Sequence, residues 1–408
     1  HPRFLPYVLP SPNGISAFAD ALADTLNQNS NMWTLSPAAN AIEQRVIGWF
    51  HELFQFPCAA GGIITSGGSM ANLTALAIAR DAYLGDRARA EGLQGRSSPL
   101  RIYISEQVHN SVDKAAAILG LGLDHIRHIP CDSQLRIRMD LLKEAVALDR
   151  REGFSPFCVV GSAGTVTTGA IDPLDALADF CEEEGLWLHL DGAYGALAIL
   201  GDRLRSQLLP AGRAHSLSLD PHKMLFVPLE AGCVLVRDAK AMHATYSFVP
   251  SYLSMDADEH FLNYAEYGPQ LSRSFKALKV WWSLRAYGRK AYARAIDNLC
   301  DLAAYMGQRA GAEPELELIA PVTLNAVCVR GRGLTDAENA RVLARLLCID
   351  LPANVQKHHV HFRRHADGFL DHDAPADFNQ ALMEIGALVC RPGNPRCERC
   401  PLKALCCA

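Results

Sequence analysis

The chain has 408 residues, of which 49% are apolar and 20% charged, a balance that excludes long disorder, collagen and a coiled coil. Its 39 Lys and Arg against 44 Asp and Glu leave a net charge of −5, so we expect no global basic surface for nucleic acid. No apolar run approaches the ~18 residues that a membrane helix needs, and we expect no membrane span.

The cysteines suggest a reducing environment. Eight of the 13 are scattered singly, mostly in apolar stretches, and the other five follow residue 389. A disulfide scaffold is not expected in a chain long enough to bury a large core, so we predict a cytoplasmic protein. The sequence begins with His1 and no charged-then-apolar leader follows, which indicates a trimmed start or a fragment.

Apolar spacing in the first part of the chain predicts helices over 15–27 and 39–54. After residue 60, short β-rich runs alternate with helical stretches. Strands are predicted at 101–105, 125–129, 157–162, 186–191, 215–220 and 232–237, and helices at 111–120, 139–151 and 173–185. This alternation predicts an α/β domain with a mostly parallel sheet and helices on both faces. Such sheets bind ligands at the carboxyl ends of their strands.

The chain becomes helical again from about residue 271. Two short strands, at 316–320 and 325–331, precede a helix predicted over 335–347, which indicates a second, smaller α+β domain. The resulting division is an N-terminal segment (1–55), a large domain (56–290), a small domain (291–350) and a His- and Cys-rich tail (351–408).

Three short segments carry candidate chemistry. TSGGSMANLTALAIAR (65–80) is a Gly-rich turn entering a helix, which forms either an anion cradle or a simple packing turn. Asp191 ends an apolar strand in HLDGAYG, where it binds a ligand or caps the following turn. Lys223 follows a strand in SLSLDPHKMLF, and either acts as an amine nucleophile or extends its head into water.

Together these parts match the needs of pyridoxal phosphate. The cradle would hold the phosphate, Asp191 the protonated ring nitrogen, and Lys223 the aldehyde. His109, in EQVHNSV, is available to stack on the ring, although it also fits an exposed residue at a helix start. We therefore predict pyridoxal 5′-phosphate as the cofactor.

The same residues carry a family resemblance. From HPRFLPY (1–7) to about residue 347, the chain resembles the group II pyridoxal-dependent decarboxylases, through NMWTLSPAANAIE, TSGGSMAN, EQVHNSVDKA, GSAGTVTTGAIDPL, HLDGAYG, DPHK and LSRSFKALKVWWSLRAYG. The resemblance implies a fold type I pyridoxal-phosphate enzyme. It also implies cofactor-binding roles for Gly68, Ser69, His109, Thr165, Asp191, Ala193, His222 and Lys223, with Lys223 forming the internal aldimine.

The resemblance further implies amino acid decarboxylation in a homodimer. Residues 239–271 resemble the family's mobile catalytic loop, and Tyr264 matches its protonating tyrosine, with a packed aromatic residue as the alternative. By the same analogy Tyr7 and Trp33 lie near the substrate side chain, which favours an aromatic or bulky apolar amino acid.

The C-terminal tail suggests a metal centre. Cys390, Cys397, Cys400 and Cys406 have the uneven spacing of an iron–sulfur site rather than of two zinc knuckles. Residues 377–406 are similar to the [4Fe–4S] loop of adenine DNA glycosylases, in which basic residues reach DNA phosphates. The basic residues available here are Arg391, Arg396, Arg399 and Lys403. No helix-hairpin motif precedes Asp336, so glycosylase activity is not expected, and KHHVHFRRH (357–365) is predicted to be an exposed junction rather than a metal site.

Three functions remain open on the sequence alone. The first is a decarboxylase, and the second is another pyridoxal-phosphate reaction on the same fold, such as oxidative deamination to an aldehyde. The third is a nucleic-acid-binding module built on the cysteine tail with a vestigial enzyme core. We take the decarboxylase as the main prediction.

Overall fold

The computed structural model describes residues 12–85, 87–248, 262–335 and 338–339. The predictions for Tyr7, for the histidine tract and for the four tail cysteines lie outside these residues. Most of the helix predicted over 335–347 lies outside them as well.

The chain divides into two compact units. Among the described residues, the larger unit contains those between 12 and 302 together with Thr323–Ala326, and the smaller contains Ala303–Val322 and those between 327 and 339. In the smaller unit, β8 (Leu316–Leu318) pairs antiparallel with β9 (Val329–Gly331). These two strands are shorter than the runs 316–320 and 325–331 that the sequence suggested.

The larger unit is built on a seven-stranded sheet in the order β1-β7-β6-β5-β4-β2-β3. Its strands are β1 (Gly61–Thr65), β2 (Leu100–Ser105), β3 (Ile126–Ile129), β4 (Ser155–Ser162), β5 (Trp187–Asp191), β6 (Ser216–Leu219) and β7 (Gly232–Val236). The run from β3 to β6 is parallel, whereas β7 is antiparallel to both β6 and β1. The predicted mostly parallel sheet is therefore confirmed, although β1 was not predicted as a separate strand.

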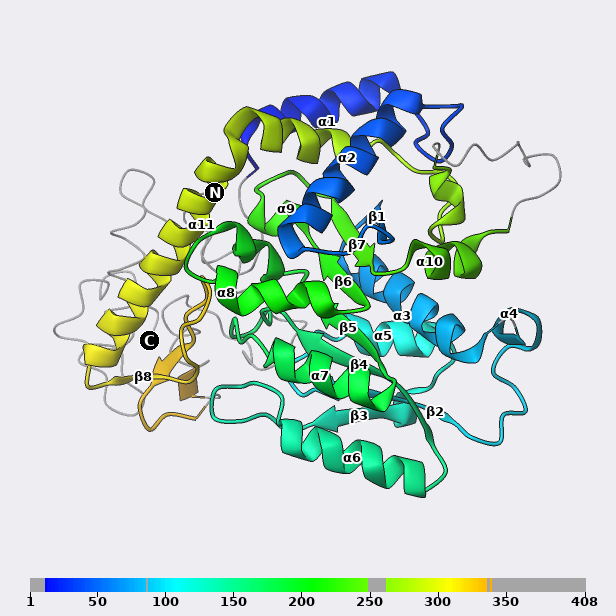
Figure 1. Ribbon diagram of the computed structural model, residues 1–408. Helices are drawn as coiled ribbons and strands as arrows, with labels where there is room; N and C mark the ends of the chain where they lie inside the picture. Colours follow the sequence, from blue (N-terminus) through cyan, green and yellow to red (C-terminus); the bar gives the residue numbers. More distant parts are fainter. Residues whose placement is uncertain (1–11, 86, 249–261, 336–337, 340–408) are drawn as a thin grey trace. The chain divides into compact units, whose positions relative to one another are not determined.

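Helices cover both faces of this sheet, as predicted. Packed against one face are α3 (Gly68–Leu84) and α5 (Ser111–Ile118), while α6 (Met139–Arg151) and α7 (Leu174–Glu184) pack against the other (Figure 1). The remaining α-helices of the described residues are α1 (Gly14–Leu26), α2 (Pro37–Phe54), α4 (Arg87–Glu91), α8 (Arg205–Leu208), α9 (Pro221–Met224), α10 (Ala239–Tyr246) and α11 (Ala277–Ala312), which is interrupted at Gly288.

The alternation of side chains along the strands produces two apolar layers. In β2, Ile102 and Ile104 belong to the layer that contains Leu76 of α3, while Tyr103 belongs to the layer on the opposite side. Successive side chains of a strand point to opposite faces, so a strand buried on both faces reads as a continuous apolar run. For this reason the short apolar runs of the sequence were sufficient to locate these strands.

The segment after Lys223 is anchored to the first helix. Asn13 caps α1, because its Oδ1 accepts a hydrogen bond from the Ser16 N–H at 3.0 Å. Its Nδ2 donates to the Phe226 carbonyl at 2.9 Å and to Ser283 Oγ at 2.7 Å. One side chain thus fixes a helix start and the turn that follows the predicted nucleophile.

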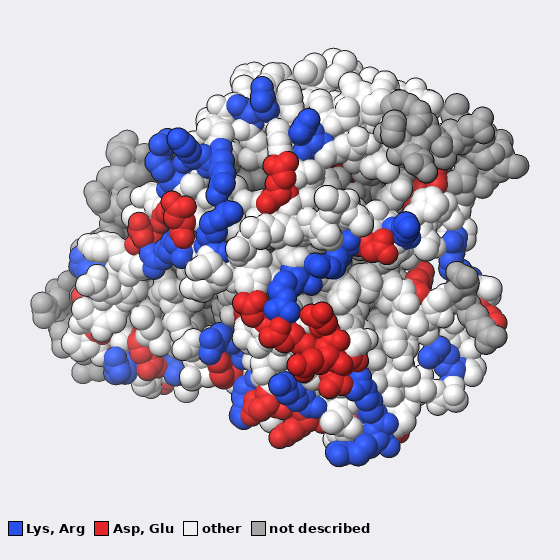
Figure 2. All heavy atoms as spheres, viewed as in Figure 1, with Lys and Arg blue, Asp and Glu red and all other residues white. Residues whose placement is uncertain are grey.

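Charged groups on the face shown in Figure 2 are mixed. Acidic side chains gather beside basic ones there, and Arg213 pairs with Asp175, Asp179 and Glu182 of α7. On this face the described residues form no broad basic surface. Over the described ranges, no helix has the length and apolarity needed to cross a bilayer.

Candidate active site

A cavity of about 430 Å³ lies at the carboxyl ends of the parallel strands, where the sequence placed the ligand. The strands β4 and β5 end at it, α9 follows from β6, and α3 begins beside it. Eight residues predicted for the cofactor line this one cavity: Gly68, Ser69, His109, Thr165, Asp191, Ala193, His222 and Lys223.

The start of α3 forms the expected cradle. The N–H groups of its first turn have no preceding turn to bond to, and Gly68, Ser69 and Met70 all border the cavity. A Cβ on Gly68 would lie 2.7 Å from Ala193 Cβ and 3.0 Å from Asp220 Oδ2, so only glycine permits this approach. Free amides at a helix N-terminus suit a phosphate.

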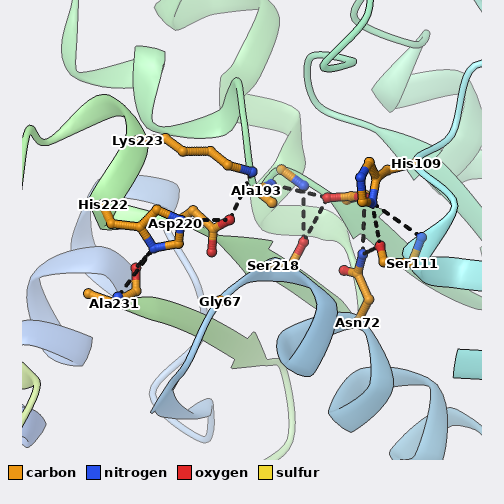
Figure 3. Close-up of polar contacts among 12 residues, drawn as sticks. Gly67, Asn72, His109, Ser111, Ala193, Ser218, Asp220, His222, Lys223 and Ala231 are labelled. Atoms are coloured by element: carbon orange, nitrogen blue, oxygen red, sulfur yellow. Dashed lines mark hydrogen bonds and ion pairs between the residues drawn. The ribbon is translucent and has the colours of Figure 1, made fainter. Parts of the chain in front are cut away.

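Asp191 ends β5 with its carboxylate held by neutral donors. Oδ2 accepts a hydrogen bond from Asn72 Nδ2 at 3.0 Å, and Oδ1 accepts from Ser218 Oγ and the Ala193 N–H, each at 3.1 Å (Figure 3). The residue is only 7% exposed. No cationic side chain of the described chain forms an ion pair with it, so its negative charge remains available to a ligand.

Lys223 extends from α9 toward a second buried carboxylate. Its Nζ lies 2.9 Å from Asp220 Oδ2, while Asp220 Oδ1 is buried with no hydrogen-bond partner among the described residues (Figure 3). Burial raises the pKa of Asp220, although the charges of Lys223 and His222 oppose this. The structure therefore places the Lys223 amine in an ion pair with a buried carboxylate.

His222 forms the wall beside this pair. Its Nδ1 lies 2.8 Å from the Ala231 carbonyl, and its Nε2 lies 3.6 Å from Asp220 Oδ2. Burial lowers the pKa of His222, with Asp220 acting in the opposite direction. The lysine, the acid and the imidazole therefore lie together in the lining of the cavity, with Asp220 Oδ2 nearest to both basic side chains.

His109 and Thr165 complete the lining. His109 is exposed at the cavity edge, two residues before α5, with Nδ1 2.9 Å from Ser111 Oγ. Thr165 Oγ1 lies 2.9 Å from Thr168 Oγ1 and accepts a hydrogen bond from the Ala170 N–H. His109 thus keeps both descriptions from the sequence, an exposed residue at a helix start and one able to face a ring.

Tyr264 does not line this cavity. It is 1% exposed in the short helix η4 (Tyr264–Glu266), and its ring centroid lies 4.8 Å from the Arg273 guanidinium carbon. Burial raises the pKa of Tyr264 well above its ordinary value. In this structure Tyr264 is packed against Arg273, as the alternative of a packed aromatic residue describes, and its protonating role stays a prediction. Residues 239–246, within the predicted loop, form α10.

Trp33 is not among the residues lining the cavity either. Its backbone N–H donates to Asn263 Oδ1 at 3.1 Å, and its side chain is partly buried. The structure therefore does not bring Trp33 together with the predicted cofactor residues.

Four polar residues of the site were not singled out from the sequence. Asn72, Ser111, Ser218 and Asp220 each contact a predicted residue. Asp220 stands in the DPHK motif, and Asn72 lies one helical turn after the cradle. Both residues could have been identified from the sequence, because each places a carboxylate or an amide close to a predicted site residue. Ser111 and Ser218 carry no such local signal.

The residues present fit pyridoxal phosphate. The helix start accepts a phosphate, Asp191 has uncompensated charge for a protonated ring nitrogen, and Lys223 provides an amine. No group of three or more His, Cys, Asp or Glu side chains that could hold a metal is present among the residues in the described ranges. The four tail cysteines fall outside those ranges.

Comparisons with known proteins agree with this site. The model of the pyridoxal-dependent decarboxylase conserved domain matches residues 1–332. An aromatic-L-amino-acid decarboxylase of Bacillus atrophaeus is 40% identical over 81% of this chain and 67% of its own length. An L-2,4-diaminobutyrate decarboxylase of Rhizobium meliloti is 33% identical over 85% of this chain and 70% of its own.

A solved structure supports the fold. The crystal structure of mouse CSAD aligns with a TM-score of 0.79 at 26% identity, covering 86% of this chain and 76% of that one. The predicted fold class and resemblance are thereby confirmed, and with them a pyridoxal-phosphate-dependent carboxy-lyase at the level of the family. The similarity of residues 377–406 to glycosylase loops stays a prediction. The chain belongs to the pyridoxal-dependent decarboxylase family.

Proposed function

We propose that this chain removes the α-carboxylate of an L-amino acid with pyridoxal phosphate bound in the cavity described above. One observation carries the proposal: a single cavity is lined by the α3 cradle, by Asp191 without a cationic partner, and by Lys223. When bound, the cofactor supplies an aldehyde that condenses with amines and a ring that accepts electrons from a bond breaking at Cα.

The chain's own residues divide the remaining tasks. The first turn of α3 binds the phosphate, which fixes the cofactor within the cavity. Asp191 faces the ring nitrogen and favours its protonated form, because an opposite charge a few ångströms away stabilises a cation. His109, at the cavity edge, covers the ring and limits the access of water.

Asp220 accepts the proton that the Lys223 amine must lose. An ammonium is not a nucleophile, so Lys223 must lose a proton before it reacts with an aldehyde. Asp220 Oδ2, at 2.9 Å from Nζ, is the acceptor in contact with it, and the raised pKa of Asp220 makes that transfer easier. His222 Nε2 lies 3.6 Å from the same carboxylate, beyond hydrogen-bond distance, and acts on it through its proximity.

The cavity lining favours a bulky side chain on the substrate. Val166, Leu229 and Tyr194 line the same space as the catalytic groups, and the Bacillus relative acts on aromatic amino acids. Glu230 also lines the cavity, 3.3 Å from Lys276, and favours a second candidate, a substrate with an amine in its side chain. The diaminobutyrate relative is consistent with that alternative.

The test is carbon dioxide release from an amino acid panel. The full chain, saturated with pyridoxal phosphate, is assayed with tryptophan, tyrosine, phenylalanine, 2,4-diaminobutyrate and aspartate. We expect release from an aromatic member that disappears in Lys223→Ala. Borohydride trapping and peptide mapping should place the cofactor on residue 223. Cofactor trapped at Lys223 with no carbon dioxide from any substrate would overturn the decarboxylase proposal.

Measuring ammonia and aldehyde in the same reactions separates decarboxylation from oxidative deamination. Decarboxylation alone releases carbon dioxide and an amine in equal amounts. Stoichiometric aldehyde and ammonia would instead favour the second reaction that the sequence left open.

We propose that the enzyme acts as a homodimer in the cytoplasm and that Cys390, Cys397, Cys400 and Cys406 bind one [4Fe–4S] cluster. Sedimentation of the full chain tests the dimer. Iron and sulfide analysis of anaerobically purified protein tests the cluster, with the four cysteines changed to Ser as control.

The nucleic-acid alternative has a separate test. Retention of the full chain on DNA at low salt, lost when Arg396→Ala and Arg399→Ala are combined, would support it.

A further inference from the structure

His189 is completely buried beside the site and has no role in the proposed function. It lies on β5 two residues before Asp191, and its side chain is 0% exposed. Its Nε2 lies 3.0 Å from Asn72 Oδ1, and its Nδ1 lies 2.9 Å from Ser216 Oγ. Both ring nitrogens are therefore engaged by polar side chains.

These contacts belong to one chain of hydrogen bonds with a fixed direction. The indole N–H of Trp187 can only donate, and it donates to Ser216 Oγ at 2.9 Å. At the other end an ionised Asp191 can only accept, and it accepts from Asn72 Nδ2. If the imidazole between this obligatory donor and this obligatory acceptor is neutral, the groups of the chain have one arrangement.

The direction of this chain determines the tautomer of His189. Because Asn72 turns its NH₂ group toward Asp191, its Oδ1 faces His189, so Nε2 must carry the hydrogen. Nδ1 is then the acceptor for the Ser216 hydroxyl. Both conditions require a neutral imidazole, and burial lowers the pKa of His189 to about 4, against the effect of the Asp191 charge.

The fixed amide of Asn72 orients two further side chains of the site, Asp191 and Ser111. One hydrogen of its Nδ2 goes to Asp191, and the other goes to Ser111 Oγ at 2.9 Å. The Ser111 hydroxyl can then donate to His109 Nδ1. An amide cannot exchange its proton as an imidazole does, so Asn72 transmits orientation from His189 without transferring its proton to Asp191.

We propose that His189 is a positioning residue: as the Nε2–H tautomer it fixes the Asn72 amide, which holds Asp191 toward the ring nitrogen of the cofactor and Ser111 toward His109. This inference rests on the proposed function. Without the His189 donor, the amide is free to turn its oxygen toward Asp191, which would place two acceptors against each other.

The test compares pyridoxal phosphate with its analogue in which the ring nitrogen is replaced by CH. Dissociation constants of both ligands are measured for the full chain, for His189→Leu and for His189→Gln, whose amide can donate in place of Nε2. We expect His189→Leu to lower the preference for pyridoxal phosphate over the analogue about tenfold, and His189→Gln to restore most of it.

A matched control removes another histidine. His51→Leu removes a ring whose Nε2 lies 3.1 Å from the Gly61 carbonyl, outside the cavity lining, and should leave the ligand preference unchanged. Equal weakening of both ligands in His189→Leu would indicate a general structural role and overturn the inference. Failure of the unaltered chain to bind pyridoxal phosphate would overturn the proposed function instead.

A second measurement does not require the Leu variant to fold. Nitrogen-15 NMR of the unaltered full chain reports the tautomer of His189 directly. We expect a neutral ring with hydrogen on Nε2 between pH 6 and 8. Hydrogen on Nδ1, or a doubly protonated ring in that range, would contradict the arrangement on which the inference depends.

Discussion

Two buried carboxylates in this protein are stabilised in opposite ways. Glu43 of α2 is paired with a cation, since its Oε1 lies 2.5 Å from an Arg273 nitrogen, with both side chains at most 4% exposed. Asp191 is buried among neutral donors only, from Asn72, Ser218 and the Ala193 backbone.

The difference separates a structural carboxylate from a functional one. The pair of Glu43 and Arg273 is satisfied internally: Arg273 also donates to the Ser30 and Ile64 carbonyls, and Glu43 accepts from the Ile64 N–H. This cluster joins α2 to β1, the strand leading to the cradle. Asp191 retains a net negative charge that a cationic ligand can neutralise. Neither burial nor the lack of a counter-charge identifies a site by itself; Asp191 is distinguished because it combines both with a place in the cavity lining.

Breaking the structural pair should have the largest effect on stability. Arg273→Met leaves Glu43 as an uncompensated buried charge, and we expect the free energy of unfolding to fall by about 3–5 kcal/mol. Urea denaturation measures this. Adding Glu43→Gln to Arg273→Met should recover part of the loss, and a double variant as unstable as the sum of the singles would contradict the coupling.

Neutralising the functional carboxylate should affect catalysis instead. In Asp191→Asn we expect carbon dioxide release to fall about 100- to 1,000-fold, because the charge facing the ring nitrogen is lost. The free energy of unfolding should fall by about 1–3 kcal/mol, because the amide offers one acceptor oxygen to donors that now bind two. Asp172→Asn is a matched control, since Asp172 is also buried but accepts only backbone N–H groups and lies outside the cavity lining. Equal loss of activity in both variants would remove the distinction.

The neutral His189 predicts a pH dependence of stability. Its pKa is about 4 in the folded chain against 6.5 for the ordinary group, so the unfolded chain binds the extra proton first. The stabilisation is complete above pH 6.5 and is lost as the pH falls toward 4. Between pH 7.5 and 5 the protein should lose about 2 kcal/mol that His189→Gln does not lose. An equal loss of unfolding free energy between pH 7.5 and 5 in both proteins would contradict the assignment of His189 as neutral.

The smallest effect is expected at Tyr264. Tyr264→Phe keeps the ring over Arg273 and removes only a hydroxyl outside the cavity lining, so we expect activity within about twofold and stability within about 1 kcal/mol. A rapid assay of carbon dioxide is sufficient. A hundredfold loss would instead support the protonating role that the family resemblance suggested.

Much of the fold could be predicted because its signals are local. The helix predicted over 139–151 has those bounds in the structure, and each predicted strand of the large sheet is present within two residues. The missing strand, β1, is the sequence GGIIT, which runs directly into the glycines of the cradle. Its pairing with β7 depends on a partner more than 160 residues away, which no local pattern reveals.

The candidate site was partly predictable for the same reason. Gly68, Asp191 and Lys223 stand in short motifs, so their residue type and position on an element indicated their chemistry. The position of Tyr264 along the chain says nothing about which way its ring packs, so its contact with Arg273 emerged only from the tertiary structure. Asp220 carried a local signal, but its contact with Lys223 emerged only from the fold of α9.

The sequence by itself determined the order of most strands and helices, the cofactor class and the roles expected of Asp191 and Lys223, because periodicity and short motifs are properties of neighbouring residues. The tertiary structure alone decided how those groups are oriented. In the register of β5 against β6, His189 lies beside Ser216 and Asp191 beside Ser218, while α3 brings Asn72 between His189 and Asp191. Hydrogen-bond direction depends on such non-local pairings, since a slip of one residue would turn these side chains to the other face of the sheet.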